Sequence, residues 1–291
     1  MNLIKLFLLL ISWEDVSNTP ESPVYADSLF SRRQFNEAIT EYKRYVFEYG
    51  NSKILDSVYL QIALSYRYTG DINNSNKFLD LSLVNTVSQN RISQINIDKA
   101  INHIVKEDFD LASGTLLTVL QSTTDTQVIR QASYYLLVID VLKSDYKSAK
   151  LRFLDDFLNL DSCKQLYGNR IEILTLLDSA AKIRYKDVKK AKLLSSFLPG
   201  LGQIYCKACI KEALNAFILN GSMVALVTIS IVNADYVDAI IFGYFLYLFY
   251  SGNRYKTEII CTNYNKALDR SFKIAILSEL SKPYWFFNDF K

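Results

Sequence analysis

The sequence predicts an all-α protein, namely an α-solenoid of about four helix-pair repeats followed by a transmembrane or membrane-associated helical hairpin. Three observations support this prediction. Small residues recur every 37 positions in the first half, a basic stretch covers residues 182–192, and 20 uncharged residues follow at 213–232. A fixed period of this size is typical of stacked units that cannot bury their apolar faces alone. Proteins built in this way mostly bind other proteins.

Length and composition set the outer limits. The chain has 291 residues, of which 50% are hydrophobic and 22% are charged, enough for one or two domains with a buried core. The net charge of +3 hides an uneven distribution, because residues 20–160 carry 15 Lys/Arg against 17 Asp/Glu, and residues 161–291 carry 17 against 11. Since the basic half also holds the apolar runs, we expect membrane lipid, and no nucleic acid, as a partner.

Residues 1–21 form a separate N-terminal segment. An apolar core at 6–11 follows a single lysine, Lys5. The next residues, Trp13-Glu14-Asp15, supply no small-x-small cleavage site. Two interpretations therefore stay open, a cleaved signal peptide and an uncleaved anchor or plain apolar start.

Residues 22–183 are predicted to form the repeat domain, with residues 164–183 as a capping helix. Small residues would let two helices cross closely, while large apolar residues fill the wider gaps. An ordinary helical bundle with an accidental period is the alternative. Three columns keep the period: the small residues Ala38, Ser75, Ala112 and Ala149; the residues three positions earlier, Phe35, Ile72, Phe109 and Tyr146; and those four positions later, Tyr42, Leu79, Leu116 and Phe153.

Helix ends can be predicted within each repeat. Gly70 is expected to end one helix in a left-handed conformation, and Asp71 to cap the next helix. Asp108 and Asp145 precede the corresponding helices of the third and fourth repeats, so we expect the same capping there. Glu107 and Ser144 stand where Gly70 stands in the second repeat.

These positions resemble the tetratricopeptide repeat family. The period is three residues longer than the usual 34 of that family, and the third and fourth repeats lack its glycine. The resemblance implies a solenoid whose concave groove binds a protein or peptide. The matching residues are Ala26, Leu29, Phe35, Ala38 and Tyr42 in the first repeat, and Tyr59, Ile62, Ala63, Tyr66, Gly70, Ser75 and Leu79 in the second.

Residues 184–291 are predicted to contain a basic juxtamembrane helix, a membrane hairpin and a C-terminal helix. The basic residues of 182–192 either contact anionic headgroups or form a solvated helix face. Residues 193–205 are too short and too interrupted to span a bilayer, whereas 213–232 are long enough. Residues 239–250 are marginal alone but plausible as the second arm of a hairpin. A hairpin buried in a soluble core is the alternative. The C-terminal aromatic run at 284–287, with Phe290, would dock on the protein or at the interface.

Polar residues interrupt the long apolar segment. Asn215 and Asn220 are expected to hydrogen-bond across to a neighbouring helix, and Gly221 with Ala225 to permit its close approach. The alternative is that these polar residues line a path for transport or for ions, although no ionisable residue lies in the segment.

A second resemblance covers this half. It is to a membrane region with the pattern P-G-x-G-Q-x-Y found behind tetratricopeptide repeats in uncharacterised bacterial envelope proteins. The resemblance implies location and architecture without an established activity. At the bend we expect Gln203 and Tyr205 to hydrogen-bond freed backbone groups. The residues that match are Pro199, Gly200, Gly202, Gln203, Tyr205, Asn215, Tyr250, Gly252 and Asn253, with Tyr264-Asn265 further on.

Few residues could carry chemistry. Cys206 and Cys209 form a lone C-x-x-C without the second pair that a zinc site needs, so incidental thiols are favoured over redox or metal chemistry, and a disulfide involving Cys261 stays open. His103 is the single histidine and is expected to pack in a repeat. We expect no catalytic residues, no metal and no cofactor, and we regard the carboxylates at 155–156 as poor acid/base candidates.

The expected function is a non-enzymatic scaffold or adaptor that binds a protein at the bacterial envelope membrane. The alternatives are an accessory for membrane-protein insertion or transport, and a thiol redox module. Two rules disagree on sidedness, since a working signal peptide would export the repeats and the positive-inside rule would keep them in the cytoplasm. The resemblance favours the periplasmic side of the inner membrane.

Overall fold

The computed structural model describes residues 23–50, 54–155 and 167–282. All regular secondary structure within these ranges is helical, so the predicted all-α class is confirmed. The N-terminal segment, Cys163 and the aromatic tail lie outside the described residues. The helices are α2 (Val24–Ser31), α3 (Phe35–Glu48), α4 (Leu55–Thr69), α5 (Ile72–Asn85), α6 (Gln89–Val105), α7 (Phe109–Ser122), α8 (Thr126–Leu142), α9 (Tyr146–Phe153), α10 (Tyr167–Ala181), α11 (Val188–Phe197), α12 (Leu201–Tyr205), α13 (Ile210–Val232) and α14 (Tyr236–Leu280).

The chain divides into two compact units, which we describe separately. Among the described residues, the first contains those between 23 and 181 together with 274–282, and the second contains 182–273. The predicted membrane-side region, 184–291, therefore differs from the second unit at its C-terminal end. The last turns of α14 belong to the first unit because Ile276, Leu277 and Leu280 are buried there, and the Tyr134 hydroxyl donates a 3.2 Å hydrogen bond to the carbonyl of Leu280.

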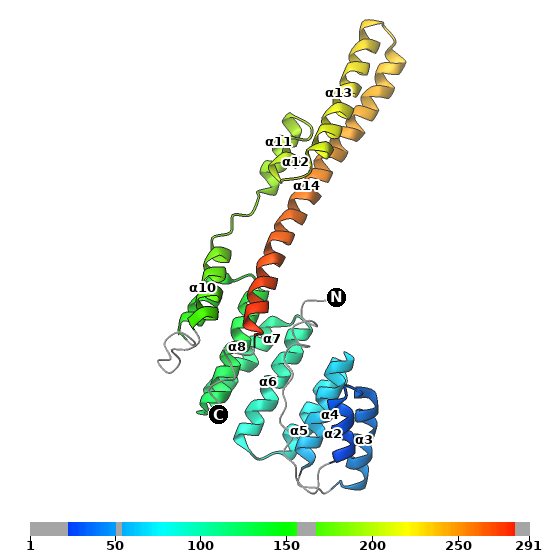
Figure 1. Ribbon diagram of the computed structural model, residues 1–291. Coiled ribbons are helices and arrows are strands. Elements are labelled where there is room, and N and C mark those ends of the chain that lie inside the picture. Colours follow the sequence, from blue (N-terminus) through cyan, green and yellow to red (C-terminus); the bar gives the residue numbers. More distant parts are fainter. Residues whose placement is uncertain (1–22, 51–53, 156–166, 283–291) are drawn as a thin grey trace. The chain divides into compact units, whose positions relative to one another are not determined.

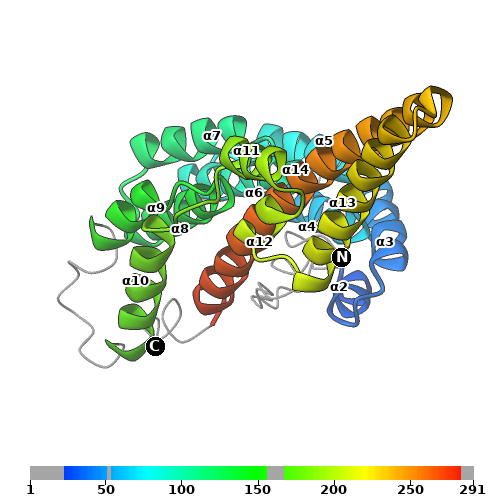
Figure 2. The same cartoon turned by 90° about the horizontal axis from the view of Figure 1, so that it is seen from above.

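In the first unit each helix from α2 to α10 packs against the next, and α6 also contacts α8 (Figure 1). Figure 2 shows the same succession from above. The four small residues of the 37-residue period are fully buried, and so are the four large residues that follow them by four positions. The column three positions earlier is less enclosed, since Ile72 and Tyr146 are buried and Phe35 and Phe109 are half-buried.

The turn within each helix pair repeats with the same period. Arg33, Gly70, Glu107 and Ser144 have φ values of 61°, 88°, 65° and 61°, all in the left-handed region. The amide of each following residue donates a 2.9 Å hydrogen bond to the carbonyl five positions before it, as in Asp71 to Tyr66. This geometry satisfies carbonyls at the helix end. Three non-glycine residues therefore adopt the backbone conformation that the sequence signals only at Gly70.

The capping prediction is only partly right. Asp71 accepts a hydrogen bond from the amide of Asn74 at 3.0 Å, and Asp145 accepts one from Ser148 at 3.2 Å. These bonds, with those from the side chains of the same two residues, hold the pKa of each carboxyl below its usual value. Asp108 makes no such capping bond, so the prediction is wrong there. Its backbone still accepts from Ala112, so the helix begins at the expected place.

Glycine at position 107 should stabilise the first unit. Glu107→Gly is expected to raise the free energy of unfolding by about 0.5–1 kcal/mol, because glycine takes this conformation without the clash that L side chains suffer. Denaturant unfolding followed by circular dichroism would measure the change.

Gly70→Ala is the matched control and should lose a similar amount. A Cβ at Gly70 would meet no other atom within 4 Å, so the loss would come from the backbone conformation alone. A destabilised Glu107→Gly variant would contradict the role of this turn.

The second unit contains α11, α12, α13 and residues 236–273 of α14. α13 and α14 are joined by residues 233–235, and α13 lies alongside the first part of α14 (Figures 1 and 2). α13 is the one helix among the described residues that is long and apolar enough to cross a membrane. Only 11% of its most apolar 18-residue stretch is buried, unlike the core helix of a soluble protein.

Candidate functional site

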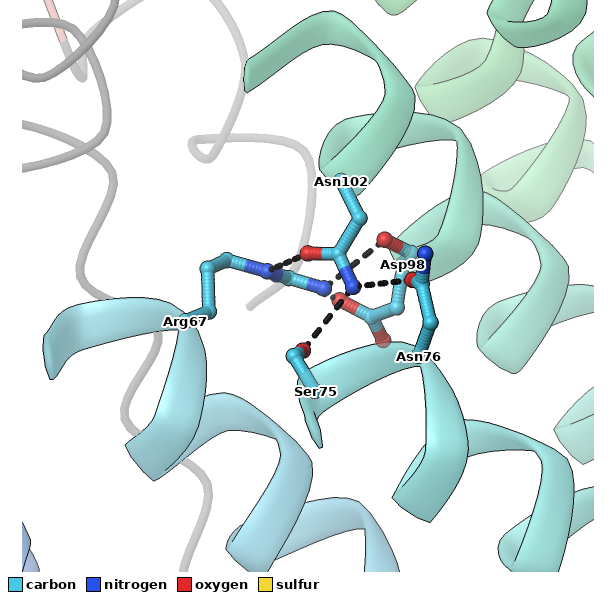
Figure 3. A network of polar contacts seen from close by, with 5 residues as sticks. All are labelled: Arg67, Ser75, Asn76, Asp98 and Asn102. Atoms are coloured by element: carbon cyan, nitrogen blue, oxygen red, sulfur yellow. Dashed lines mark hydrogen bonds and ion pairs between the residues drawn. The ribbon is translucent and has the colours of Figure 1, made fainter. Parts of the chain in front are cut away.

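A buried polar network lies between α4, α5 and α6 of the first unit (Figure 3). Arg67 donates to the Asp98 carboxylate at 2.9 Å, to the Asp98 carbonyl at 2.8 Å and to Oδ1 of Asn102 at 2.7 Å. Nδ2 of Asn102 then donates to Oγ of Ser75 at 2.8 Å and to Oδ1 of Asn76 at 2.6 Å. The network explains why the second small residue of the period is a serine, since its hydroxyl accepts a bond that alanine could not.

The ion pair in this network is almost fully enclosed. The Arg67 and Asp98 side chains are 7% and 9% exposed. Burial raises the pKa of Asp98, and the Arg67 guanidinium opposes that rise. Each partner thus compensates the charge of the other, as buried charges require. No local sequence pattern indicates this pair, because its members lie 31 positions apart on different helices.

The P-G-x-G-Q-x-Y residues meet in the second unit at the junction of α11 and α12. Gly200 has φ of 91°, and a Cβ there would overlap the carbonyl oxygen of Ala213. A Cβ on Gly202 would overlap the carbonyl oxygen of Ala191 and lie 2.6 Å from Oγ of Ser195. Glycine is therefore required at both positions, by conformation and contact at 200 and by contact at 202.

Buried polar side chains tie this junction to α14. The Gln203 amide donates to Oδ1 of Asn253 at 2.8 Å, and the hydroxyls of Ser195 and Thr257 are 2.8 Å apart. Asn253 donates to the Ser195 carbonyl at 3.4 Å. The prediction that Gln203 hydrogen-bonds backbone at the bend is wrong. Gln203 bonds the Asn253 side chain, and it is Asn253 that donates to the backbone carbonyl of Ser195. We call Ser195, Gly202, Gln203, Asn253 and Thr257 the motif cluster.

Two tyrosines of the pattern hold neighbouring backbone. The Tyr250 hydroxyl donates to the carbonyl of Ser196 at 2.9 Å. The Tyr205 hydroxyl accepts from the amide of Asp187 at 3.4 Å, so it bonds backbone at the start of α11 and not at the bend, where the prediction placed its partner. The ammonium groups of Lys186 and Lys190 lie 4.6 and 5.6 Å from the centre of its ring, close enough for cation–π attraction. These residues of the pattern therefore hold α11, α12 and α14 together through contacts at 200–205, 250 and 253.

Other predicted residues of this region differ from expectation. Asn215 is exposed on α13, and Asn220 donates to the carbonyl of Ala216 in its own helix at 2.8 Å, so the predicted bond across to a neighbouring helix is not made by Asn220. A Cβ on Gly221 would meet no other atom within 4 Å, so the predicted close approach is not made within the described chain. A Cβ on Gly252 would likewise meet no other atom within 4 Å, so the structure gives no packing reason for glycine at this position.

The cysteines of the C-x-x-C lie in different surroundings. Cys206 is buried with Cys261 and Ala191, while Cys209 is exposed. Burial, with a contribution from neighbouring Cys261, raises the pKa of Cys206 to about 12. A thiol with so high a pKa is a poor nucleophile and a poor metal ligand. Among the described residues, no group of three His, Cys, Asp or Glu side chains could hold a metal ion.

Alkylation should separate these thiols. At pH 7.5 we expect iodoacetamide to modify Cys209 at least tenfold faster than Cys206, because only the thiolate reacts and Cys206 stays protonated. Peptide mapping by mass spectrometry at several reaction times would measure both rates. Equal rates would contradict the burial of Cys206 and revive the redox alternative.

The remaining titratable candidates carry no assembled site. His103 is half-buried, as expected for a packing residue, and its Nδ1 makes no hydrogen bond with any described residue. Asp155 is exposed, and its neighbour at 156 lies outside the described residues. No protein-family model, curated protein or solved structure matches this chain.

Proposed function

We propose that this protein is a membrane-anchored helical-repeat scaffold that binds a protein segment and catalyses no reaction. The observation that carries the proposal is α13, a 23-residue apolar helix whose most apolar stretch is only 11% buried. Such a helix in water would expose a large apolar surface, which monomeric soluble proteins rarely do. At 1.5 Å per residue its length is about 34 Å, enough to cross a hydrocarbon core of about 30 Å.

The distribution of charge at the two ends of α13 supports the anchor. Lys182, Arg184 and the basic residues of α11 precede it, whereas Asp235 and Asp238 follow its far end. Part of the basic charge is engaged within the unit, since Lys192 pairs with Glu258 at 2.7 Å and Lys256 with Glu212 at 3.2 Å. Lys189 is exposed and would be available to anionic headgroups. We infer that α13 and the start of α14 form the membrane hairpin.

The first unit supports a binding role. Four turns with one backbone geometry and one 37-residue period favour a solenoid, and solenoids present extended surfaces to protein segments. α8 is not such a surface, because its residues 131–139 are all buried and its Tyr134 hydroxyl bonds α14. We therefore assign the groove to α2, α4 and α6, the first helices of the three preceding pairs.

Vesicle flotation tests the anchor. The full chain, mixed with vesicles of phosphatidylcholine and phosphatidylglycerol, should float with them and stay bound after washing at alkaline pH, because an inserted helix is held by apolar burial and not by charge. Release by the alkaline wash would show surface adsorption and contradict the proposal.

The bacterial inner membrane, with the first unit on the periplasmic side, is the location that we propose. It rests on the resemblance to envelope proteins, whereas the basic residues before α13 favour the opposite side by the positive-inside rule. Protease added to spheroplasts decides between them. Digestion of the first unit would support the periplasmic side, and its protection would place it in the cytoplasm.

A further inference from the structure

A groove with a cavity of about 440 Å³ lies between α13 and α14 in the second unit, and Ser196, Phe197 and Pro199, at or just after the end of α11, also line it. Its lining includes Phe217, Asn220 and Gly221 of α13, and Gly243, Leu246 and Tyr247 of α14. We call it the interhelical groove. Phe217 and Tyr247 are 48% and 66% exposed, so the groove is open to its surroundings. Its volume is within the range of sites that bind ligands.

The two glycines leave space in this groove. Glycine in a helix interior is destabilising relative to alanine. Within the described chain nothing requires it here, because a Cβ on Gly221 or on Gly243 would meet no other atom within 4 Å. Gly200 and Gly202 differ, since their Cβ atoms would overlap backbone. Small residues on an apolar helix face are typical of surfaces that another helix approaches closely.

Asn220 adds a polar requirement to the groove. The residue is only 3% exposed, and Oδ1 of its side chain is buried. Nδ2 donates to the carbonyl of Ala216, but Oδ1 accepts no hydrogen bond from any described residue. An unsatisfied buried acceptor is unfavourable, and in an apolar setting no water is at hand to satisfy it. The occupant of the groove should therefore bring a hydrogen-bond donor.

The depth of Asn220 identifies the kind of occupant. It lies ten residues after Ile210, about 15 Å along α13 at 1.5 Å per residue, which is near the middle of the span. Lipids carry hydroxyl and amide donors at headgroup level, whereas a protein helix can carry one at any depth. Gly221 and Gly243 also favour a helix as the occupant, because they permit the backbone of a helix to come close.

We propose that the interhelical groove binds one apolar α-helix of a partner membrane protein, and that a hydroxyl or amide side chain near the middle of that helix donates to Oδ1 of Asn220. This inference rests on the proposed membrane location of α13. It adds a second binding surface, distinct from the one assigned to α2, α4 and α6 of the first unit.

A designed helix serves as the probe. It is a 23-residue peptide of leucine and alanine with one central serine and lysines at both ends, and its control has leucine in place of the serine. The full chain, with a photoreactive residue in place of Leu246, is reconstituted in phosphatidylcholine and phosphatidylglycerol vesicles. Crosslinking is then measured against peptide concentration. The serine peptide should bind roughly three- to thirtyfold more tightly than the leucine peptide, the range expected for an interhelical hydrogen bond.

Matched variants locate the site. Asn220→Leu should abolish the difference between the two peptides. Gly221→Leu together with Gly243→Leu should abolish crosslinking of both, because the new side chains fill the groove. Ser222→Leu also adds volume to the same helix, but at an exposed position that does not line the groove, so it should leave binding unchanged.

Three results would overturn the proposal: equal crosslinking of both peptides in the wild-type chain, crosslinks to lipid alone, and crosslinks only to a second copy of this chain. Flotation of each sample separates this failure from that of the anchor. A chain that floats but does not crosslink to the peptides refutes only the proposed binding at the groove. A chain that does not float refutes both the groove and the membrane anchor.

Discussion

Replacing Arg67 with methionine is expected to lower the free energy of unfolding of the first unit by about 3–5 kcal/mol, the usual result of removing one member of a buried ion pair. The variant leaves the Asp98 carboxylate enclosed without its cation and removes the donor to Asn102. Thermal and denaturant unfolding followed by circular dichroism would measure the loss.

The pH dependence of this variant identifies the mechanism. Burial raises the pKa of Asp98, and without Arg67 the pKa should rise further. In the unfolded chain the carboxyl ionises near pH 4, so above that pH the folded variant binds more protons than the unfolded one. Its stability should then fall as the pH rises, and the variant should be less stable at pH 8 than at pH 5.

Two controls accompany this prediction. Arg44→Met removes an arginine whose side chain is 63% exposed, and should change the stability by less than about 0.5 kcal/mol. The double variant Arg67→Met with Asp98→Leu should recover much of the loss, since apolar replacements of buried pairs are often tolerated. A single variant that loses under about 1 kcal/mol would mean that water reaches the network.

Two arginines on α13 are expected to abolish stable membrane association. Ile218 is 57% exposed and Ala225 is also exposed, and both lie near the middle of the helix. In the middle of a bilayer each arginine costs about 2.5–3.5 kcal/mol, so Ile218→Arg with Ala225→Arg should cost about 5–7 kcal/mol. The variant should appear in the soluble or aggregated fraction after alkaline washing of membranes.

The same number of charges elsewhere provides the control. Phe47 and Val84 of the first unit are 90% and 84% exposed, and Phe47→Arg with Val84→Arg should leave the protein in the membrane fraction. If the α13 variant also stays there, with unchanged resistance to the wash, then α13 is not the anchor.

The sequence anticipated much of the first unit. Period and residue size indicated the four buried small positions, and Gly70-Asp71 marked one turn. The same turn at Arg33, Glu107 and Ser144 could not be recognised, because side chains disfavour the left-handed conformation and tertiary packing imposes it. The Arg67–Asp98 ion pair was not predicted for another reason, since partners on different helices leave no local sequence pattern.

The second unit was less predictable. The P-G-x-G-Q-x-Y residues and Asn253 were found by resemblance, but Ser195 and Thr257 were not, and the hydrogen bond between Gln203 and Asn253 forms only in the fold. α14 continues from Tyr236 to Leu280 with no proline to break it, so the change from one unit to the other inside the helix has no sequence signal. The interhelical groove likewise depends on how α13 and α14 face each other.

Depth-dependent quenching tests most directly the claim that α13 crosses the membrane. A fluorescent amino acid is placed at Ile218, and at Val84 for reference, in the full chain reconstituted with lipids whose acyl chains carry nitroxides at different depths. We predict strong quenching at 218, greatest for the nitroxide nearest the bilayer centre, and little at 84. Equal and weak quenching at both positions would contradict a transmembrane α13.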